Sequence, residues 1–119
     1  EPQLALEHYE AARARVPEHP IGWAGIAQAY ALMGDTRRAN EALSNLMQMR
    51  ETRYVSPYLF AMIYARLRDA DAAFFWLRNA ADEPDFNFVC ARVDPTFDFL
   101  HADSRWSALM LRYGFNVES

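Results

Sequence analysis

The most constraining feature of this sequence is a set of residue types that returns every 34 positions. Ala5, Ala39 and Ala73 follow one another along the chain at this spacing. The same spacing joins Tyr9, Leu43 and Leu77, then Ala12, Leu46 and Ala80, and also the pairs Ala27 and Ala61, and Tyr30 and Tyr64. A fixed period in this range indicates a stack of similar units, and its length suits one helix–turn–helix unit. The sequence therefore predicts an all-α solenoid, in which each unit packs against its neighbours.

Proline, glycine and aspartate divide the repeating region into five expected helices. These are residues 2–16, 20–33, 36–50, a fourth helix that follows a break at 51–54 and ends at residue 67, and 70–82. Gly34 is typical of a residue that ends a helix, and Asp35 and Asp69 are typical N-caps. Pro57 is tolerated because it falls in the first turn of its helix.

The repeated residue types end after Pro84. The next step of the period from Tyr64 reaches Asp98, and residues 83–93 show no clean period. Asp94 followed by Pro95 favours a short helix to about residue 101, since aspartate caps a helix and proline suits its first position. A last helix is expected after Asp103. We therefore expect seven helices and no strand, with residues 83–119 forming an irregular segment and a helical cap.

Composition limits the classes of protein that the chain can belong to. Its 119 residues favour one domain, and 52% of them are apolar, as in globular proteins. A net charge of −4 argues against a nucleic-acid partner, because phosphate backbones attract basic surfaces. No run of about 18 apolar residues exists, so no membrane span is expected. The single cysteine, Cys90, permits no internal disulfide, and we expect a cytoplasmic protein.

Residues 1 to about 82 resemble the tetratricopeptide repeat (TPR) family. The segment from Gly22 to Tyr30, followed by Gly34, Asp35 and Ala39, is similar to the family's first helix, turn and second-helix start. Residues 57–80 resemble a second copy, with Pro57 in place of the family's tryptophan and Arg68 in place of its turn glycine. Ala5, Tyr9, Ala12 and Pro17 look like the second helix of a further copy.

The resemblance implies a superhelix of about 2.5 repeats with a C-terminal helical cap. Its parts are a half repeat at 1–17, full repeats at 20–50 and 54–82, and the cap at 83–119. Small residues are needed where the helices of a unit cross closely, and large ones fill the layers between units. The expected core of the repeats consists of Tyr9, Trp23, Ala27, Tyr30, Ala39, Leu43, Ala61, Tyr64, Ala73 and Leu77.

Residues 94–113 are similar to the segment that closes such arrays in bacterial multidomain proteins. Those proteins include transcription regulators, nucleotide cyclases and protein kinases. All 12 basic residues of the chain are arginine, a bias that also suggests a bacterial source. Because the chain opens on Glu1 within a helical pattern, we expect it to be part of a longer protein.

Candidate catalytic and metal-binding residues are scattered along the chain. His8, His19 and His101 are far apart, and none has a partner at metal-ligand spacing. Asp98 and Asp103 suit turns and helix caps better than a catalytic or metal-binding role. Cys90 lies near Arg92, which could lower a thiol pKa, but a buried small hydrophobe is the simpler interpretation. We therefore expect no enzyme activity, cofactor or metal site.

The expected binding surface is the inner face of the first helices of each repeat. Tyr58, Met62 and Ala65 recur at helical spacing about 120° from the packing face. In the family this face lines a concave groove, which implies partner contacts from Ala24, Gln28, Tyr58 and Met62, with Arg66 at the edge. The alternative is that these residues are merely exposed, or are buried under the cap.

The groove residues also limit the kind of partner. The chaperone-binding members of the family hold a terminal carboxylate with lysine and asparagine on this face. Here Ala24 and Gln28 occupy those places, and the chain has no lysine. A mixed apolar peptide or helix is therefore the expected ligand, since methionine adapts to such partners.

Two other functions remain open from the sequence. The first is homodimerisation through the apolar side of Leu4, Leu6 and Tyr9, which a missing upstream helix would leave partly uncovered. The second is a small-molecule sensor, for which the irregular stretch 83–101 is the only place where convergent polar groups could form a pocket.

Overall fold

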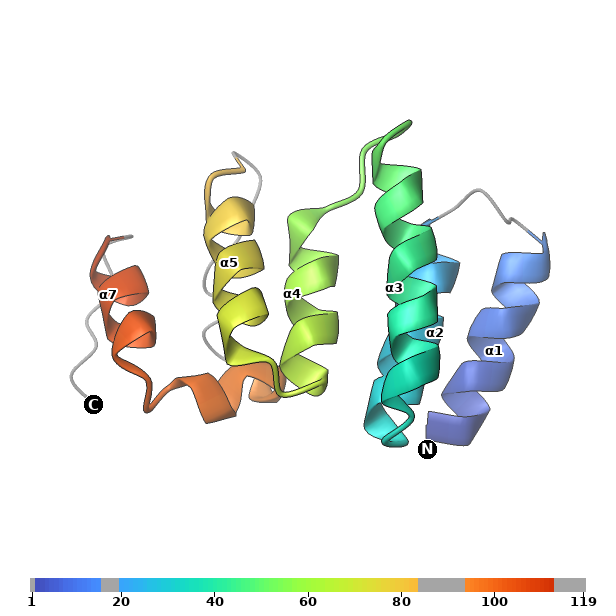
Figure 1. Ribbon diagram of the computed structural model, residues 1–119, viewed down its shortest axis with the longest axis horizontal. Coiled ribbons are helices and arrows are strands. Elements are labelled where there is room, and N and C mark those ends of the chain that lie inside the picture. The colour runs from blue at the N-terminus through green and yellow to red at the C-terminus, as the bar shows by residue number, and fades with distance from the viewer. Residues whose placement is uncertain (1, 16–19, 84–93, 113–119) are drawn as a thin grey trace.

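The computed structural model describes residues 2–15, 20–83 and 94–112, and every element in these ranges is a helix (Figure 1). The elements are α1 (Pro2–Arg15), α2 (Pro20–Leu32), α3 (Thr36–Arg50), α4 (Pro57–Arg66), α5 (Ala70–Ala81), the 3-10 helix η1 (Pro95–Leu100) and α7 (Ser104–Arg112). The expected all-α class is thus confirmed for the described residues. The helix ends lie close to their expected positions, within the usual uncertainty of helix boundaries.

The helices pack as a row of pairs. α2 packs against α3, and α4 packs against α5, each pair being joined by a short turn. α1 lies on α2, while η1 lies on α4 and α7 contacts α5. The molecule measures 44 × 29 × 19 Å, with α1 at one end and α7 at the other (Figure 1).

The 34-residue period continues in the backbone beyond the point where the side-chain pattern ends. α3, α5 and α7 begin at Thr36, Ala70 and Ser104, and α2, α4 and η1 end at Leu32, Arg66 and Leu100. Both sets of boundaries keep the spacing of the sequence repeat. The end of η1 and the start of α7 therefore keep the spacing of the two preceding pairs, although η1 packs on α4 and α7 packs on α5. The short helix expected from Asp94 and Pro95 and the last helix expected after Asp103 are both present.

The turns inside the first two pairs have the same backbone geometry. Gly34 and Arg68 both adopt left-handed conformations, with φ of 79° and 63°. In each turn the amide of the next residue donates to a carbonyl five positions back, from Asp35 to Tyr30 (2.9 Å) and from Asp69 to Tyr64 (3.0 Å). Glycine adopts this conformation without steric cost, whereas arginine adopts it with a steric cost from its Cβ atom. Arg68 thus occupies the position of a turn glycine, as the aligned repeats predict.

The expected N-caps are confirmed. The carboxylate of Asp35 accepts a hydrogen bond from the Arg38 amide (3.1 Å), and that of Asp69 accepts one from the Ala72 amide (3.2 Å). Asp94 caps η1 in the same way. Each such cap satisfies an amide that the helix itself leaves unpaired.

The core runs along the row of helices. Of the expected core residues, Ala27, Ala39, Leu43, Ala61, Ala73 and Leu77 are buried, and Tyr9, Trp23, Tyr30 and Tyr64 are partly buried against them. Phe60 of α4 stacks on Trp76 of α5, with ring centroids 4.5 Å apart. Phe97 and Leu100 bury η1 against the same core, and Trp106, Leu109 and Met110 do so for α7. Both η1 and α7 are therefore integral parts of the fold.

Candidate partner-binding site

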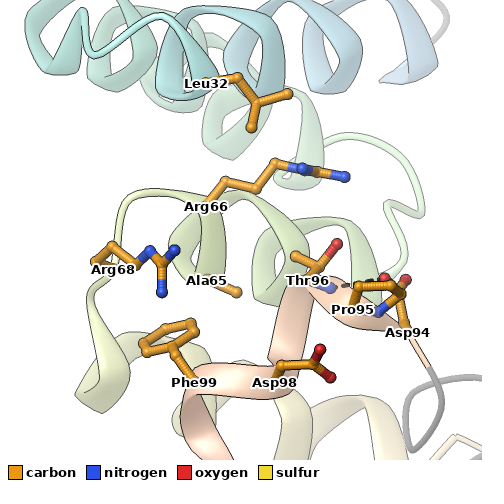
Figure 2. Close-up of a pocket in the computed structure, with 9 residues that line it drawn as sticks. All are labelled: Leu32, Ala65, Arg66, Arg68, Asp94, Pro95, Thr96, Asp98 and Phe99. Atoms are coloured by element: carbon orange, nitrogen blue, oxygen red, sulfur yellow. Dashed lines mark hydrogen bonds between the residues drawn. The ribbon is translucent and has the colours of Figure 1, made fainter.

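A cavity of about 500 Å³ lies where α2, α4 and η1 meet, and Figure 2 shows the residues around it. The contacts of α4 with both α2 and η1 bring these three elements together. The lining residues are Leu32 at the end of α2; Ala65, Arg66 and Arg68 at the end of α4; and Asp94, Pro95, Thr96, Asp98 and Phe99 at η1. Its volume falls within the range of ordinary ligand sites, about 300–1,000 Å³.

Three of the five expected groove residues offer surface to a partner. Gln28, Met62 and Arg66 are half-buried, and Arg66 lines the cavity. The Nε atom of Arg66 donates to Oε1 of Gln28 at 2.9 Å. This hydrogen bond ties α2 to α4 and holds the arginine side chain across the inner face.

The other two expected residues lie further from solvent. Ala24 is only 1% exposed, so its methyl group has almost no free surface. Tyr58 is half-buried beneath η1, with its ring centroid 5.7 Å from that of Phe97. Its hydroxyl donates a long hydrogen bond of 3.5 Å to Oδ2 of Asp94. At this position the alternative of burial under the C-terminal segment describes the structure better than an open groove.

Most residues that line the cavity were not predicted as site residues from the sequence. Leu32 is 52% exposed at the cavity rim, yet it lies outside the repeated face. The guanidinium of Arg68 lies 4.8 Å from the ring centre of Phe99, so the strained turn residue contacts η1. The Asp94–Pro95 cap signal places the start of η1, but nothing in the sequence pattern brings η1 onto α4.

Two charged groups outside the cavity, Asp103 and Arg105, act at the start of α7. Asp103 accepts hydrogen bonds from the Arg105 guanidinium and amide, and these lower the pKa of its carboxyl. Arg105 also pairs with Asp71 of α5 at 2.7 Å, which ties α7 to α5. The pKa of Tyr64 is raised, mainly by burial and also by the nearby Asp69 carboxylate.

A second hollow of about 320 Å³ lies between α1, α2 and α3. Its aromatic floor is covered by the chain's own cations. The Arg13 guanidinium lies 4.9 Å from the ring centre of Trp23, and that of Arg38 lies 5.7 Å from the ring centre of Tyr30. Both rings therefore already have cationic partners from the chain itself.

The described residues contain no group of three or more histidine, cysteine or acidic side chains that could hold a metal ion. Within the same ranges, no helix combines the length and apolar character needed to cross a membrane. His101 stacks on Trp106, with ring centroids 4.3 Å apart. His19, Cys90 and Arg92 lie outside the described residues, as does most of the stretch 83–101.

Comparison with known proteins identifies no relative. No protein-family model matches the chain, and neither a curated protein nor a solved structure is significantly similar to it. What is established is the class: an all-helical protein whose described residues form helix pairs with a 34-residue period.

Proposed function

We propose that this chain is a non-enzymatic protein–protein interaction module that binds a partner segment on the inner face of α2, α4 and η1. We assign its helix pairs to the TPR type of superhelix. The 34-residue spacing of helix boundaries and the repeated left-handed turns support this assignment. The cavity of about 500 Å³ between the ends of α2 and α4 and η1 is the observation that carries the functional proposal.

Binding would proceed by burial of a partner segment, without covalent chemistry. Leu32 and Met62 supply apolar contact, and the linked Gln28 and Arg66 supply hydrogen bonds. A face built from so few helices supports micromolar affinity, about −8 kcal/mol. We further propose that the module is the scaffolding or sensory part of a larger bacterial regulatory protein, which the resemblance of residues 94–113 supports.

The test begins by selecting, from a displayed library of random short peptides, those that bind the immobilised chain. The selected peptides are labelled, and their dissociation constants are measured by fluorescence polarisation. Leu32→Ser removes an exposed apolar contact from the cavity rim, and we expect it to weaken binding at least tenfold. Leu111→Ser is the matched control, because Leu111 is similarly exposed on α7, away from the cavity. Equal effects of the two substitutions, or a library without binders, would contradict the proposal.

Self-association is a second candidate function, favoured by exposed leucines at the two ends of the row. Leu4 on α1 is 64% exposed and Leu111 on α7 is 62% exposed. Leu6, which we expected to share the uncovered side of α1, is instead buried, because it faces the core of the stack. Light scattering across about a hundredfold range of concentration separates the two functions. A dimer that persists on dilution and is lost in Leu4→Gln would favour self-association.

A further inference from the structure

The cavity beside η1 carries two positive and two negative side chains that do not pair with one another. Arg66 and Arg68 come from the end of α4, and Asp94 and Asp98 come from η1 (Figure 2). Among the described residues, no ion pair within 4.0 Å joins either arginine to either aspartate. A cavity lined by both signs of charge, without neutralisation across it, is complementary to a ligand that also carries both signs.

Other contacts hold three of these four side chains in place. Arg66 uses its Nε atom for Gln28, and Arg68 lies over the ring of Phe99. The Oδ1 atom of Asp94 accepts from the Thr96 amide at 2.9 Å. Figure 2 shows Arg66 and Arg68 between Leu32 and the residues of η1. Oδ2 of Asp94 also accepts from the Tyr58 hydroxyl at 3.5 Å, so each oxygen of this carboxylate already has one partner. The other N–H groups of the two arginines and the exposed Asp98 carboxylate remain available to a ligand.

At other places in the described chain, opposite charges do pair. Arg37 and Glu41 approach to 3.0 Å on α3, and Arg105 bonds both Asp71 and Asp103. The charges of the cavity differ from these pairs, because other contacts hold the two arginines and Asp94. Arg66 has four guanidinium N–H groups besides Nε, in a planar arrangement that matches a carboxylate.

We propose that the cavity binds a segment of a partner protein in which an acidic and a basic side chain are close together in the sequence. The acid contacts Arg66 and Arg68, and the base contacts Asp94 and Asp98. Leu32 and Phe99 pack against the aliphatic stems of these long side chains. The inference rests on the proposed function and names the chemistry of the segment that the inner face takes. A segment of one sign would meet repulsion from half of the cavity.

The experiment pairs substitutions in the chain with substitutions in the peptides selected above. Arg66→Gln and Asp98→Asn remove one charge of each sign from the cavity. Arg37→Gln and Glu41→Gln are the matched controls, since they remove the same charges on the exposed side of α3. We expect the selected peptides to contain an acid and a base at a constant spacing. Neutralising either one in the peptide should weaken binding about tenfold, the effect of losing a charged hydrogen bond of about 1.4 kcal/mol.

The decisive readout is the coupling between the two sets of substitutions. Arg66→Gln should weaken the parent peptide but not the peptide whose acid is already glutamine, and Asp98→Asn should couple to the peptide's base in the same way. Arg66→Lys retains the charge and should recover part of the affinity. Thermal unfolding monitored by circular dichroism shows whether each variant is folded. If Arg66→Gln is unfolded, the Asp98→Asn and peptide arms still decide the result.

The possible outcomes separate this inference from the proposed function. Peptides that depend on Leu32 but bind Arg66→Gln and Asp98→Asn as tightly as the parent chain would overturn the inference and leave the proposed function standing. Selected peptides of one sign would overturn it as well. Displacement of the peptide by free arginine or glutamate at low millimolar concentration would indicate a small-molecule site in place of a peptide site. A library without binders would remove both proposals.

Discussion

The contact between Tyr9 of α1 and Gly25 of α2 yields a prediction whose size follows from the structure. A Cβ atom placed on Gly25 would lie 2.2 Å from two atoms of the Tyr9 ring, well inside van der Waals contact. Gly25→Ala therefore forces the ring, and with it α1, to move. Such overpacking costs about 1–3 kcal/mol, and three overlapping ring atoms favour the upper part of that range. Alanine returns about 1 kcal/mol through its better helix propensity.

The expected net loss is about 1–2 kcal/mol, which lowers the Tm of a chain of this size by roughly 4–8 °C. Thermal unfolding monitored by circular dichroism measures it. Gly22→Ala is the matched control in the same helix, because its Cβ would lie 3.1 Å from Cβ of Arg13, a much milder contact. In a Tyr9→Ala background the ring is gone, and Gly25→Ala should become neutral or stabilising. An increase in Tm for Gly25→Ala alone would refute the reasoning.

Two further predictions concern single side chains. Arg68→Ala should lower the free energy of unfolding by about 1 kcal/mol, because it keeps the strained backbone and loses the stack on Phe99. Arg68→Gly should be about 1 kcal/mol more stable than Arg68→Ala, because glycine relieves the strain. Urea unfolding compares the two, and equal stability would contradict the assignment of strain. The pKa of Asp103 is lower in the folded state than its ordinary value of 3.8. The charged carboxylate therefore stabilises the fold at pH values above 3.8, and this contribution is lost as the pH falls through the folded-state pKa. Asp103→Asn should therefore flatten the dependence of stability on pH below about 4, and an unchanged acid limb would argue against the Arg105 pairing.

The sequence alone determined the local features of this protein. Helix ends and turns depend on residues within a few positions of one another, so Asp35, Asp69 and Asp94 could be assigned as caps from their context. The aligned repeats also placed Arg68 at a glycine position, where the backbone indeed has a positive φ. The 34-residue period predicted the helical class for a different reason, since it reflects packing that is repeated from one unit to the next.

Only the tertiary structure decided how residues from distant segments meet. The cavity depends on η1 lying against α4, and η1 is anchored there by the buried Phe97 and Leu100. That docking covers Tyr58 and brings two aspartates opposite the arginines at the end of α4. A local residue pattern does not predict the docking of η1 on α4. A contact between segments far apart in the chain depends on which side chains fit together once the helices are packed.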